Sequence, residues 1–203
     1  MRGVLPQFEI QDRNSPPSFG AMVVGMIIET PRSKLRCWRD RDRDAFAAMH
    51  ADPEVMLDTK GPLDRQHSDA KLDRYAAAFD QYGFTRWAVE SQSGDFLGYA
   101  GIMPSPPSHP LGPHADIGWR LARSAWGHGY ATEAAEAALH DAFTRCGLSE
   151  IFAYTAPDNL RSQAVMMRLG LRRDATRDFS VPNGLEVWHG LVWVARRGEW
   201  RRE

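Results

Sequence analysis

Residues 116–134 decide the fold class and read Asp-Ile-Gly-Trp-Arg-Leu-Ala-Arg-Ser-Ala-Trp-Gly-His-Gly-Tyr-Ala-Thr-Glu-Ala. A strand-like run leads into a turn that contains Gly127 and Gly129, and a helix follows directly from Tyr130. Glycines let the backbone approach a ligand closely, and the first amides of a helix are unpaired and partly positive. The segment therefore predicts an anion site suited to a phosphate or pyrophosphate. A tight turn without a ligand is the alternative, because a single Gly-x-Gly is weak evidence.

Strand-like and helix-like segments alternate on both sides of this turn. Residues 91–94, Ser-Gln-Ser-Gly, favour a hairpin, and the proline-rich residues 104–113 favour a loop. The predicted strands cover residues 27–38 with a kink near Pro31, 85–90, 96–103, 116–122, 151–156 and 186–195. The predicted helices cover residues 40–50, 64–81, 130–146 and 159–169. This order predicts an α+β or mixed α/β fold, with one sheet covered by helices.

Length, charge and cysteine content exclude several classes of protein. The chain has 203 residues with 25 Lys and Arg against 26 Asp and Glu, so the balance argues against a nucleic-acid partner. No apolar run is long enough to span a bilayer, and we expect no membrane association. Cys37 and Cys146 lie in no metal-binding or redox spacing, which favours reduced thiols and no metal site. We therefore expect a cytoplasmic protein that is a monomer or a homodimer.

The first 25 residues differ from the rest of the chain. They contain Pro6, Pro16, Pro17 and three glycines with no sustained periodicity. We predict that residues 1–25 form an irregular or disordered N-terminal extension, derived from a vector or from an upstream start. Residues 26–203 are then a single domain.

A second group of polar residues opens the helix predicted at 159–169. Asp158 or Asn159 is the expected N-cap, and Ser162 begins a stripe that continues through Val165, Met166 and Leu169. A serine at the head of an apolar stripe is unusual. Its hydroxyl either serves a binding site or bonds back to its own helix.

Several segments, in order, resemble the GNAT superfamily of N-acetyltransferases, in the branch of the ribosomal-protein acetyltransferases RimJ and RimL. They are Leu35-Arg36-x-Trp38, residues 52–56 (Asp-Pro-Glu-Val-Met), 87–90 (Trp-Ala-Val-Glu), 96–98 (Phe-Leu-Gly), 117–121 (Ile-Gly-Trp-Arg-Leu), 126–134, 159–162 (Asn-Leu-Arg-Ser) and 169–171 (Leu-Gly-Leu). The resemblance implies a mostly antiparallel sheet with one splayed pair of parallel strands, flanked by helices. The family's Gln/Arg-x-x-Gly-x-Gly/Ala loop falls on Trp126-x-x-Gly129-x-Ala131, with tryptophan at the first position.

The resemblance also implies an acetyl-CoA site and an acetyltransferase reaction. Residues implied to bind the cofactor are Leu121, Arg123, Trp126, Gly127, His128, Gly129, Tyr130, Ala131, Thr132, Asn159 and Ser162. The acceptor is a primary amine, either a protein N-terminus or a small molecule. Two other interpretations remain open: a non-catalytic CoA- or peptide-binding module of the same fold, and a nucleotide-phosphate binder of another fold.

The resemblance assigns catalytic and acceptor roles to three residues. Asp116, where the family often has Glu, is the candidate base, with a solvated strand-end carboxylate as the alternative. Ser162 is the candidate donor to the leaving thiolate, because Met166 stands where many members carry tyrosine. His189 is a candidate substrate contact or an ordinary exposed histidine. Residues 52–64 and 178–189 resemble the loops that border the family's acceptor site, and a backbone amide of 121–123 is implied to polarise the thioester carbonyl.

Overall fold

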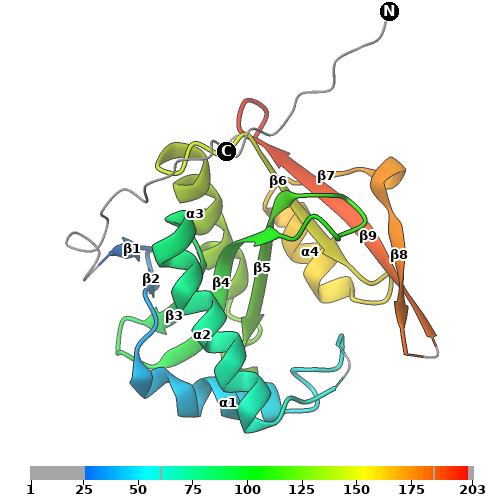
Figure 1. Cartoon of the computed structure of the whole chain (residues 1–203). Coiled ribbons are helices and arrows are strands. Elements are labelled where there is room, and N and C mark those ends of the chain that lie inside the picture. Colours follow the sequence, from blue (N-terminus) through cyan, green and yellow to red (C-terminus); the bar gives the residue numbers. More distant parts are fainter. Residues whose placement is uncertain (1–25, 60, 185, 201–203) are drawn as a thin grey trace, which may run out of the picture.

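The computed structural model describes residues 26–59, 61–184 and 186–200, so the prediction for residues 1–25 lies outside the described residues. The described residues form one nine-stranded sheet in the order β1-β2-β3-β4-β5-β6-β9-β7, and β8 pairs with β9 (Figure 1). The strands are β1 Ile27–Glu29, β2 Ser33–Arg36, β3 Arg86–Ser91, β4 Phe96–Ser105, β5 His114–Leu121, β6 Glu150–Thr155, β7 Arg172–Arg173, β8 Phe179–Asn183 and β9 Glu186–Arg196. The helices are α1 Arg43–Ala51, α2 Arg65–Tyr82, α3 Tyr130–Thr144 and α4 Leu160–Arg168, with 3-10 turns η2 Asp40–Asp42, η3 Arg123–Ala125 and η4 Ala175–Arg177.

The helices cover both faces of the sheet. On one face, α3 and α4 pack in a core that includes Ile117, Leu139 and Met166. On the other face, α1 and α2 pack in a core that includes Phe46, Tyr75 and Tyr99 (Figure 1). Successive strand residues point to opposite faces, and β4 accordingly supplies Ile102 to the first core and Tyr99 to the second. The predicted α+β architecture is confirmed.

One strand pair differs from the others and positions the site. Strands β4 and β5 are paired along eight residue pairs, from Gly98↔Leu121 to Ser105↔His114. Strands β5 and β6 are parallel and are paired only at Asp116↔Phe152. The two strands therefore diverge toward their C-terminal ends, which confirms the splayed parallel pair that the resemblance implies.

The structure corrects three of the expected segments. Residues 27–38 form a hairpin of β1 and β2 rather than one kinked strand. Pro31 has no N–H to donate, and the Thr30 amide bonds the Ser33 carbonyl across the turn at 2.9 Å. The strand predicted at 116–122 is β5, which begins at His114 and ends at Leu121, and the 3-10 turn η3 begins at Arg123. Residues 178–189 are not a loop but include the hairpin of β8 and β9.

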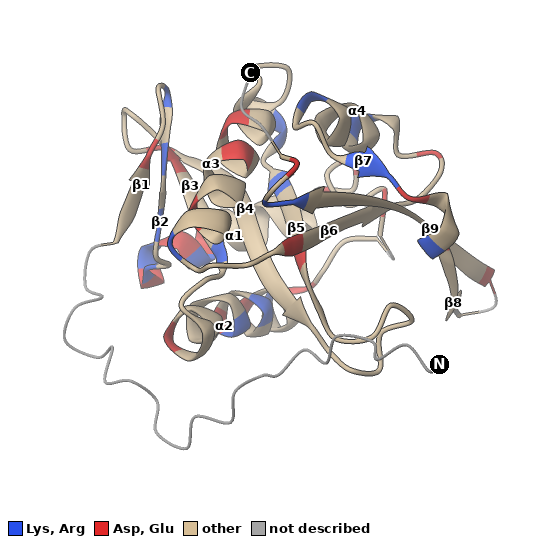
Figure 2. Cartoon of the chain, turned by 90° about the horizontal axis from the view of Figure 1, so that it is seen from above, with Lys and Arg blue, Asp and Glu red and all other residues tan. Residues whose placement is uncertain are grey.

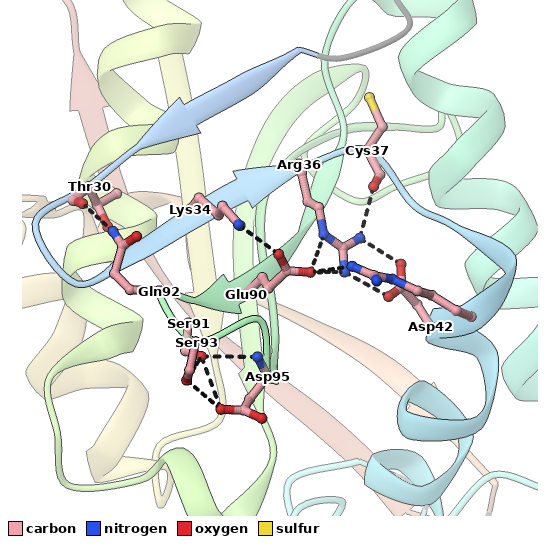
Figure 3. Close-up of polar contacts among 11 residues, drawn as sticks. Thr30, Lys34, Arg36, Cys37, Asp42, Glu90, Ser91, Gln92, Ser93 and Asp95 are labelled. Atoms are coloured by element: carbon pink, nitrogen blue, oxygen red, sulfur yellow. Dashed lines mark hydrogen bonds and ion pairs between the residues drawn. The ribbon is translucent and has the colours of Figure 1, made fainter.

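Charges of both signs are interspersed over the helices and strands (Figure 2). Inside the fold, they form a buried network between β2, β3 and η2 (Figure 3). Arg36 donates from Nε to Glu90 Oε2 at 2.7 Å and from Nη1 to Asp42 Oδ2 at 2.7 Å. Lys34 reaches the other Glu90 oxygen at 2.9 Å. Burial alone would raise the pKa of Glu90, but the bonds from Lys34 and Arg36 outweigh it and lower that pKa from 4.5 to about 2.

This network generates a stability prediction. Because the pKa of Glu90 is lowered on folding, its contribution is fully present above pH 4.5 and is lost as the pH falls toward about 2. We expect Glu90→Gln to lower the free energy of unfolding by about 3 kcal/mol at pH 7, because Arg36 loses a buried partner. We also expect the variant to lose less stability than the wild type between pH 4.5 and 2. Urea unfolding at several pH values measures both effects.

A matched control is Asp44→Asn, because Asp44 pairs with Arg65 on the exposed surface. We expect it to change the free energy of unfolding by less than about 0.5 kcal/mol. Equal effects of the two substitutions at pH 7 would contradict a stabilising role for the buried network.

Candidate active site

A cleft of about 1400 Å³ lies where β5 and β6 diverge. Its walls are the start of α3, the start of α4, the β1–β2 turn and residues 54–58 between α1 and α2. The C-terminal ends of parallel strands are a common place for ligand sites, because the strands there separate and the following loops and helices surround the gap. The cleft is therefore the candidate active site.

The start of α3 presents open backbone amides to the cleft. Gly129 is the N-cap with φ of 81°, Gly127 has φ of 79°, and no side chain caps the helix. Both backbone conformations favour glycine, and a Cβ on Gly129 would lie 3.3 Å from Nη2 of Arg32. Because the first amides of a helix have no partner within the helix, this end can accept an anion. The predicted anion site thus has the backbone geometry that it requires.

Arg32 brings a positive charge to the same end of the cleft. Its Nη1 donates to the His128 carbonyl at 2.7 Å, and its Nε donates to Glu133 Oε2 at 2.7 Å. Glu133 also accepts from the Thr30 hydroxyl at 2.6 Å, so the β1–β2 turn is held against the first turn of α3. Arg32 thereby becomes part of the wall beside Gly129.

The strand edge of β5 is open where β6 has diverged. The Ala122 amide donates to the Leu97 carbonyl of β4 at 2.9 Å, so the Leu121 amide points away from β4 and toward the cleft. The Leu121 carbonyl accepts from Nε1 of Trp126 at 3.0 Å, and the Arg161 guanidinium lies 4.4 Å from the centroid of the Trp126 ring. Among the residues that the structure describes, none pairs with the Leu121 amide, so an open amide, an indole and a cation line this side.

The start of α4 forms the opposite wall. Asn159 is its N-cap, and Asn159 Oδ1 accepts from the Ser162 amide at 3.1 Å. Ser162 lines the cleft, and its hydroxyl has no hydrogen-bond partner among residues 26–59, 61–184 and 186–200. The hydroxyl is therefore available to a ligand rather than bonded to its own helix.

The structure brings most of the predicted cofactor residues together. Those that line the cleft are Leu121, Trp126, Gly127, Gly129, Tyr130, Ala131, Thr132, Asn159 and Ser162. Arg123 and His128 are not on its wall: the Arg123 side chain pairs with Glu54, and the His128 carbonyl binds Arg32.

Asp116 does not reach the cleft wall. Its carboxylate is buried, one oxygen is paired with the Arg86 guanidinium, and the other accepts from the Ser105 hydroxyl at 3.1 Å. Gly118 makes room for this pair, because a Cβ there would lie 2.7 Å from Nη2 of Arg86. Asp116 is therefore neither a solvated strand-end carboxylate nor a cleft residue. This placement favours a structural charge pair over a base.

His189 also lies apart from the cleft. It is on β9, and its Nδ1 is 2.8 Å from the Ser180 hydroxyl on β8. The structure does not bring it to the residues around Ser162, so its contact with a substrate stays a prediction.

Sequence reasoning missed the charged residues that link the cleft walls. Arg120 is in the deciding segment, but its partners lie about 60 residues earlier, on the 52–59 segment. Its Nη1 donates to the Val55 carbonyl and, at 2.8 Å, to Asp58 Oδ1. The Asn159 side chain donates from Nδ2 to Asp58 Oδ2 at 3.1 Å. Only the resemblance of residues 52–56 to a family motif signalled that this segment borders the site.

The profile of the Acetyltransferase (GNAT) domain family matches residues 32–172. This range includes every residue that lines the cleft except Ile28, Glu29, Thr30 and Pro31. This chain belongs to the GNAT acetyltransferase family. The uncharacterized protein YkkB of Bacillus subtilis is 32% identical to this acetyltransferase over 149 residues, which cover 72% of this chain and 86% of YkkB. The predicted family and the predicted transferase activity are confirmed.

Solved structures share the fold. An acetyltransferase from Agrobacterium tumefaciens is 26% identical, covers 85% of this chain and 95% of its own, and has a TM-score of 0.72. RimJ from Mycobacterium smegmatis, in complex with CoA-disulfide, is 22% identical, covers 84% of this chain and 85% of its own, and has a TM-score of 0.64. The likeness to RimJ is one of fold and agrees with the branch that the sequence resembles.

None of the helices within 26–59, 61–184 and 186–200 combines the length and apolar character needed to cross a membrane. In the same residues, no group of three or more His, Cys, Asp or Glu side chains is placed to hold a metal ion.

The Arg86–Asp116 pair generates a prediction that separates a structural role from a catalytic one. We expect Asp116→Asn to lower the free energy of unfolding by about 3 kcal/mol, because it leaves the Arg86 guanidinium without its buried carboxylate. The double variant Arg86→Gln with Asp116→Asn should lose less stability than the two single losses added together. Urea unfolding of the four proteins measures this coupling. A stable Asp116→Asn variant that has lost only turnover would instead restore Asp116 as the base.

Proposed function

We propose that this acetyltransferase binds acetyl-CoA in the cleft and transfers the acetyl group to a primary amine by direct attack on the thioester. The observation that carries the proposal is the continuity of the cleft. It begins at the uncapped start of α3 and passes through the gap between β5 and β6 to the start of α4. An elongated ligand with a charged phosphate end and a reactive far end fits such a path.

The phosphate end of the ligand is proposed to lie at the start of α3. The amides of residues 127–132 supply hydrogen-bond donors and the positive end of the helix dipole. Arg32 and Arg161 add positive charge at the two walls, although Glu133 offsets part of the Arg32 charge. Residues present at this end therefore fit a pyrophosphate.

The pantetheine arm is proposed to run along the open edge of β5. Its amide groups need hydrogen-bond partners once water is excluded, and the Leu121 amide is free for such a bond. The same edge gives the thioester carbonyl a donor, which favours the charge that develops on its oxygen during attack. Divergence of β6 is what leaves this edge unpaired.

Ser162 is proposed to donate to the leaving thiolate. Its hydroxyl is free, and its backbone is held by the Asn159 cap at 3.1 Å. Met166 cannot take this role, because its side chain is buried in the core and has no ionisable group.

The acceptor is proposed to be a protein N-terminus or a small-molecule amine. An α-amino group has a pKa of about 7.7–8.0, so an appreciable fraction is neutral at pH 7, whereas lysine at about 10.4 is almost wholly protonated. An amine of lower pKa is therefore more readily available as the neutral nucleophile that attack on the thioester requires.

The direct test is release of free thiol from acetyl-CoA in the presence of a panel of primary amines and peptides with free N-termini. We expect thiol release that depends on the amine, with acetylated amine as the second product by mass spectrometry. Tight binding of CoA without turnover for any amine would instead favour a non-catalytic module of the same fold.

A charge placed in the first turn of α3 tests the phosphate site. We expect Thr132→Glu to weaken CoA binding at least tenfold, or about 1.4 kcal/mol, because its carboxylate would compete for the open amides and repel the pyrophosphate. The helix itself should be stabilised, since acidic side chains are favourable near a helix N-terminus. Isothermal titration calorimetry measures the dissociation constant, and thermal unfolding checks the fold.

The matched control is Thr132→Gln, which has nearly the same size and no charge. We expect its dissociation constant for CoA to stay within about threefold of the wild-type value. Equal losses in both variants would point to bulk rather than charge and would contradict the proposed phosphate position.

A further inference from the structure

Residues 52–59 follow α1 and form part of the cleft wall. The side chain of Asp58 bridges β5 and the start of α4, the helix that follows β6. Asp58 Oδ1 accepts from Nη1 of Arg120 on β5 at 2.8 Å, and Asp58 Oδ2 accepts from the side-chain Nδ2 of Asn159, at the start of α4, at 3.1 Å. The Asp58 carboxylate therefore spans the gap between β5 and α4.

The sheet separates Asp58 from the start of α3. Leu121 packs with Ala134 and Ala138 of α3, whereas the neighbouring Arg120 bonds residues 55 and 58 on the opposite face. A ligand whose phosphates bind at α3 and whose arm passes between the strands emerges on the Asp58 side. An amine that attacks from the α1–α2 face approaches this carboxylate.

Asp58 differs from two other carboxylates on the cleft wall, Glu133 and Glu54. Glu133 is held by Arg32 and Thr30 at the start of α3, and Glu54 is paired with Arg123. Asp58 instead accepts from Asn159, and Asn159 in turn accepts from the backbone amide of Ser162. Ser162 is the residue proposed to face the leaving thiolate. Its side chain is 35% exposed, so an amine can reach it, whereas that of Asp116 is only 7% exposed.

The segment that carries Asp58 is held in place. Val55 and Met56 are buried, the Met56 amide donates to the Asp52 carbonyl at 3.1 Å, and the Thr59 amide donates to the Met56 carbonyl at 3.1 Å. A catalytic group needs such support, because small displacements of a reacting group lower rates strongly.

We propose that Asp58 is the catalytic base, which takes the proton from the acceptor amine; this role rests on the proposed function. The neutral amine nitrogen forms a bond to the thioester carbon, and the carbon–sulfur bond breaks with its electron pair going to sulfur. The proton released by nitrogen passes to the Asp58 carboxylate and then to water. The thiolate accepts a hydrogen bond from the Ser162 hydroxyl and takes its proton from water. The nitrogen becomes strongly acidic once it is bonded to the carbonyl carbon, so an ordinary ionised carboxylate is a sufficient base.

The test compares Asp58→Asn with the wild type in thiol release, using a series of amines of different pKa. Asparagine keeps the size and can still accept from Arg120. We expect kcat/KM to fall about 100-fold for the more basic amines and clearly less for amines of low pKa, which lose their proton more readily. The dissociation constant for CoA should stay within about twofold, and Asp58→Glu should recover part of the rate.

Asp52→Asn is the matched control, because it removes one carboxylate from the same segment without touching the cleft wall. Asp52 accepts from the Glu54 amide at 2.9 Å, and asparagine can preserve that bond. We expect this control to retain wild-type kcat/KM.

Each other outcome overturns a specific claim. Wild-type rates in Asp58→Asn, an equal loss for all amines, or a loss of CoA binding in Asp58→Asn would overturn the role of Asp58 while leaving the proposed function intact. If Asp52→Asn lost as much kcat/KM as Asp58→Asn, the loss would come from a disturbed 52–59 segment rather than from the Asp58 carboxylate, and this would also overturn the role of Asp58. Absence of amine-dependent thiol release in the wild type would overturn the proposed function and this role together.

Discussion

The divergence of β5 and β6 after a single paired position is the constraint on which the rest of this acetyltransferase depends. Strand pairing satisfies backbone amides, so strands that separate leave these amides open to water or to a ligand. Here the separation leaves the Leu121 amide unpaired and opens a cleft between the starts of α3 and α4. The glycine turn before α3 leaves the first backbone amides of that helix open on one wall. On the other wall, the Asn159 cap of α4 fixes the backbone of Ser162.

Buried charges in this fold divide into those that support the sheet and those that face the cleft. Arg36 with Glu90 and Arg86 with Asp116 are largely shielded from solvent, and each charge lies against an opposite charge, which explains charged groups inside the sheet. Arg120 with Asp58 has the same chemistry, but its carboxylate is accessible from the cleft. Accessibility, rather than charge type, separates a structural pair from one available for chemistry.

Local signals accounted for most of the fold. The helix predicted at 64–81 is α2, Arg65–Tyr82, with Asp64 as its N-cap and Gly83 as its C-cap, and the Ser91–Gly94 turn joins β3 and β4 as expected. The single strand expected at 27–38 was wrong because a proline turn allows two short strands to pair, which depends on a neighbour, β3, remote in the sequence. The short strands β7 and β8 were missed because they exist only through pairing with β9.

The sequence by itself determined the glycine turn at the start of α3, because the Gly-x-Gly turn and the helix that follows are contiguous in the chain. It also determined the family, since many short motifs occur in the right order. Only the tertiary structure decided which carboxylates are accessible. Asp116 is removed from the cleft by Arg86, 30 residues earlier in the chain, and Asp58 is brought to Asn159 across 101 residues. Contacts over such separations depend on how the whole sheet packs, so no local pattern of residues encodes them.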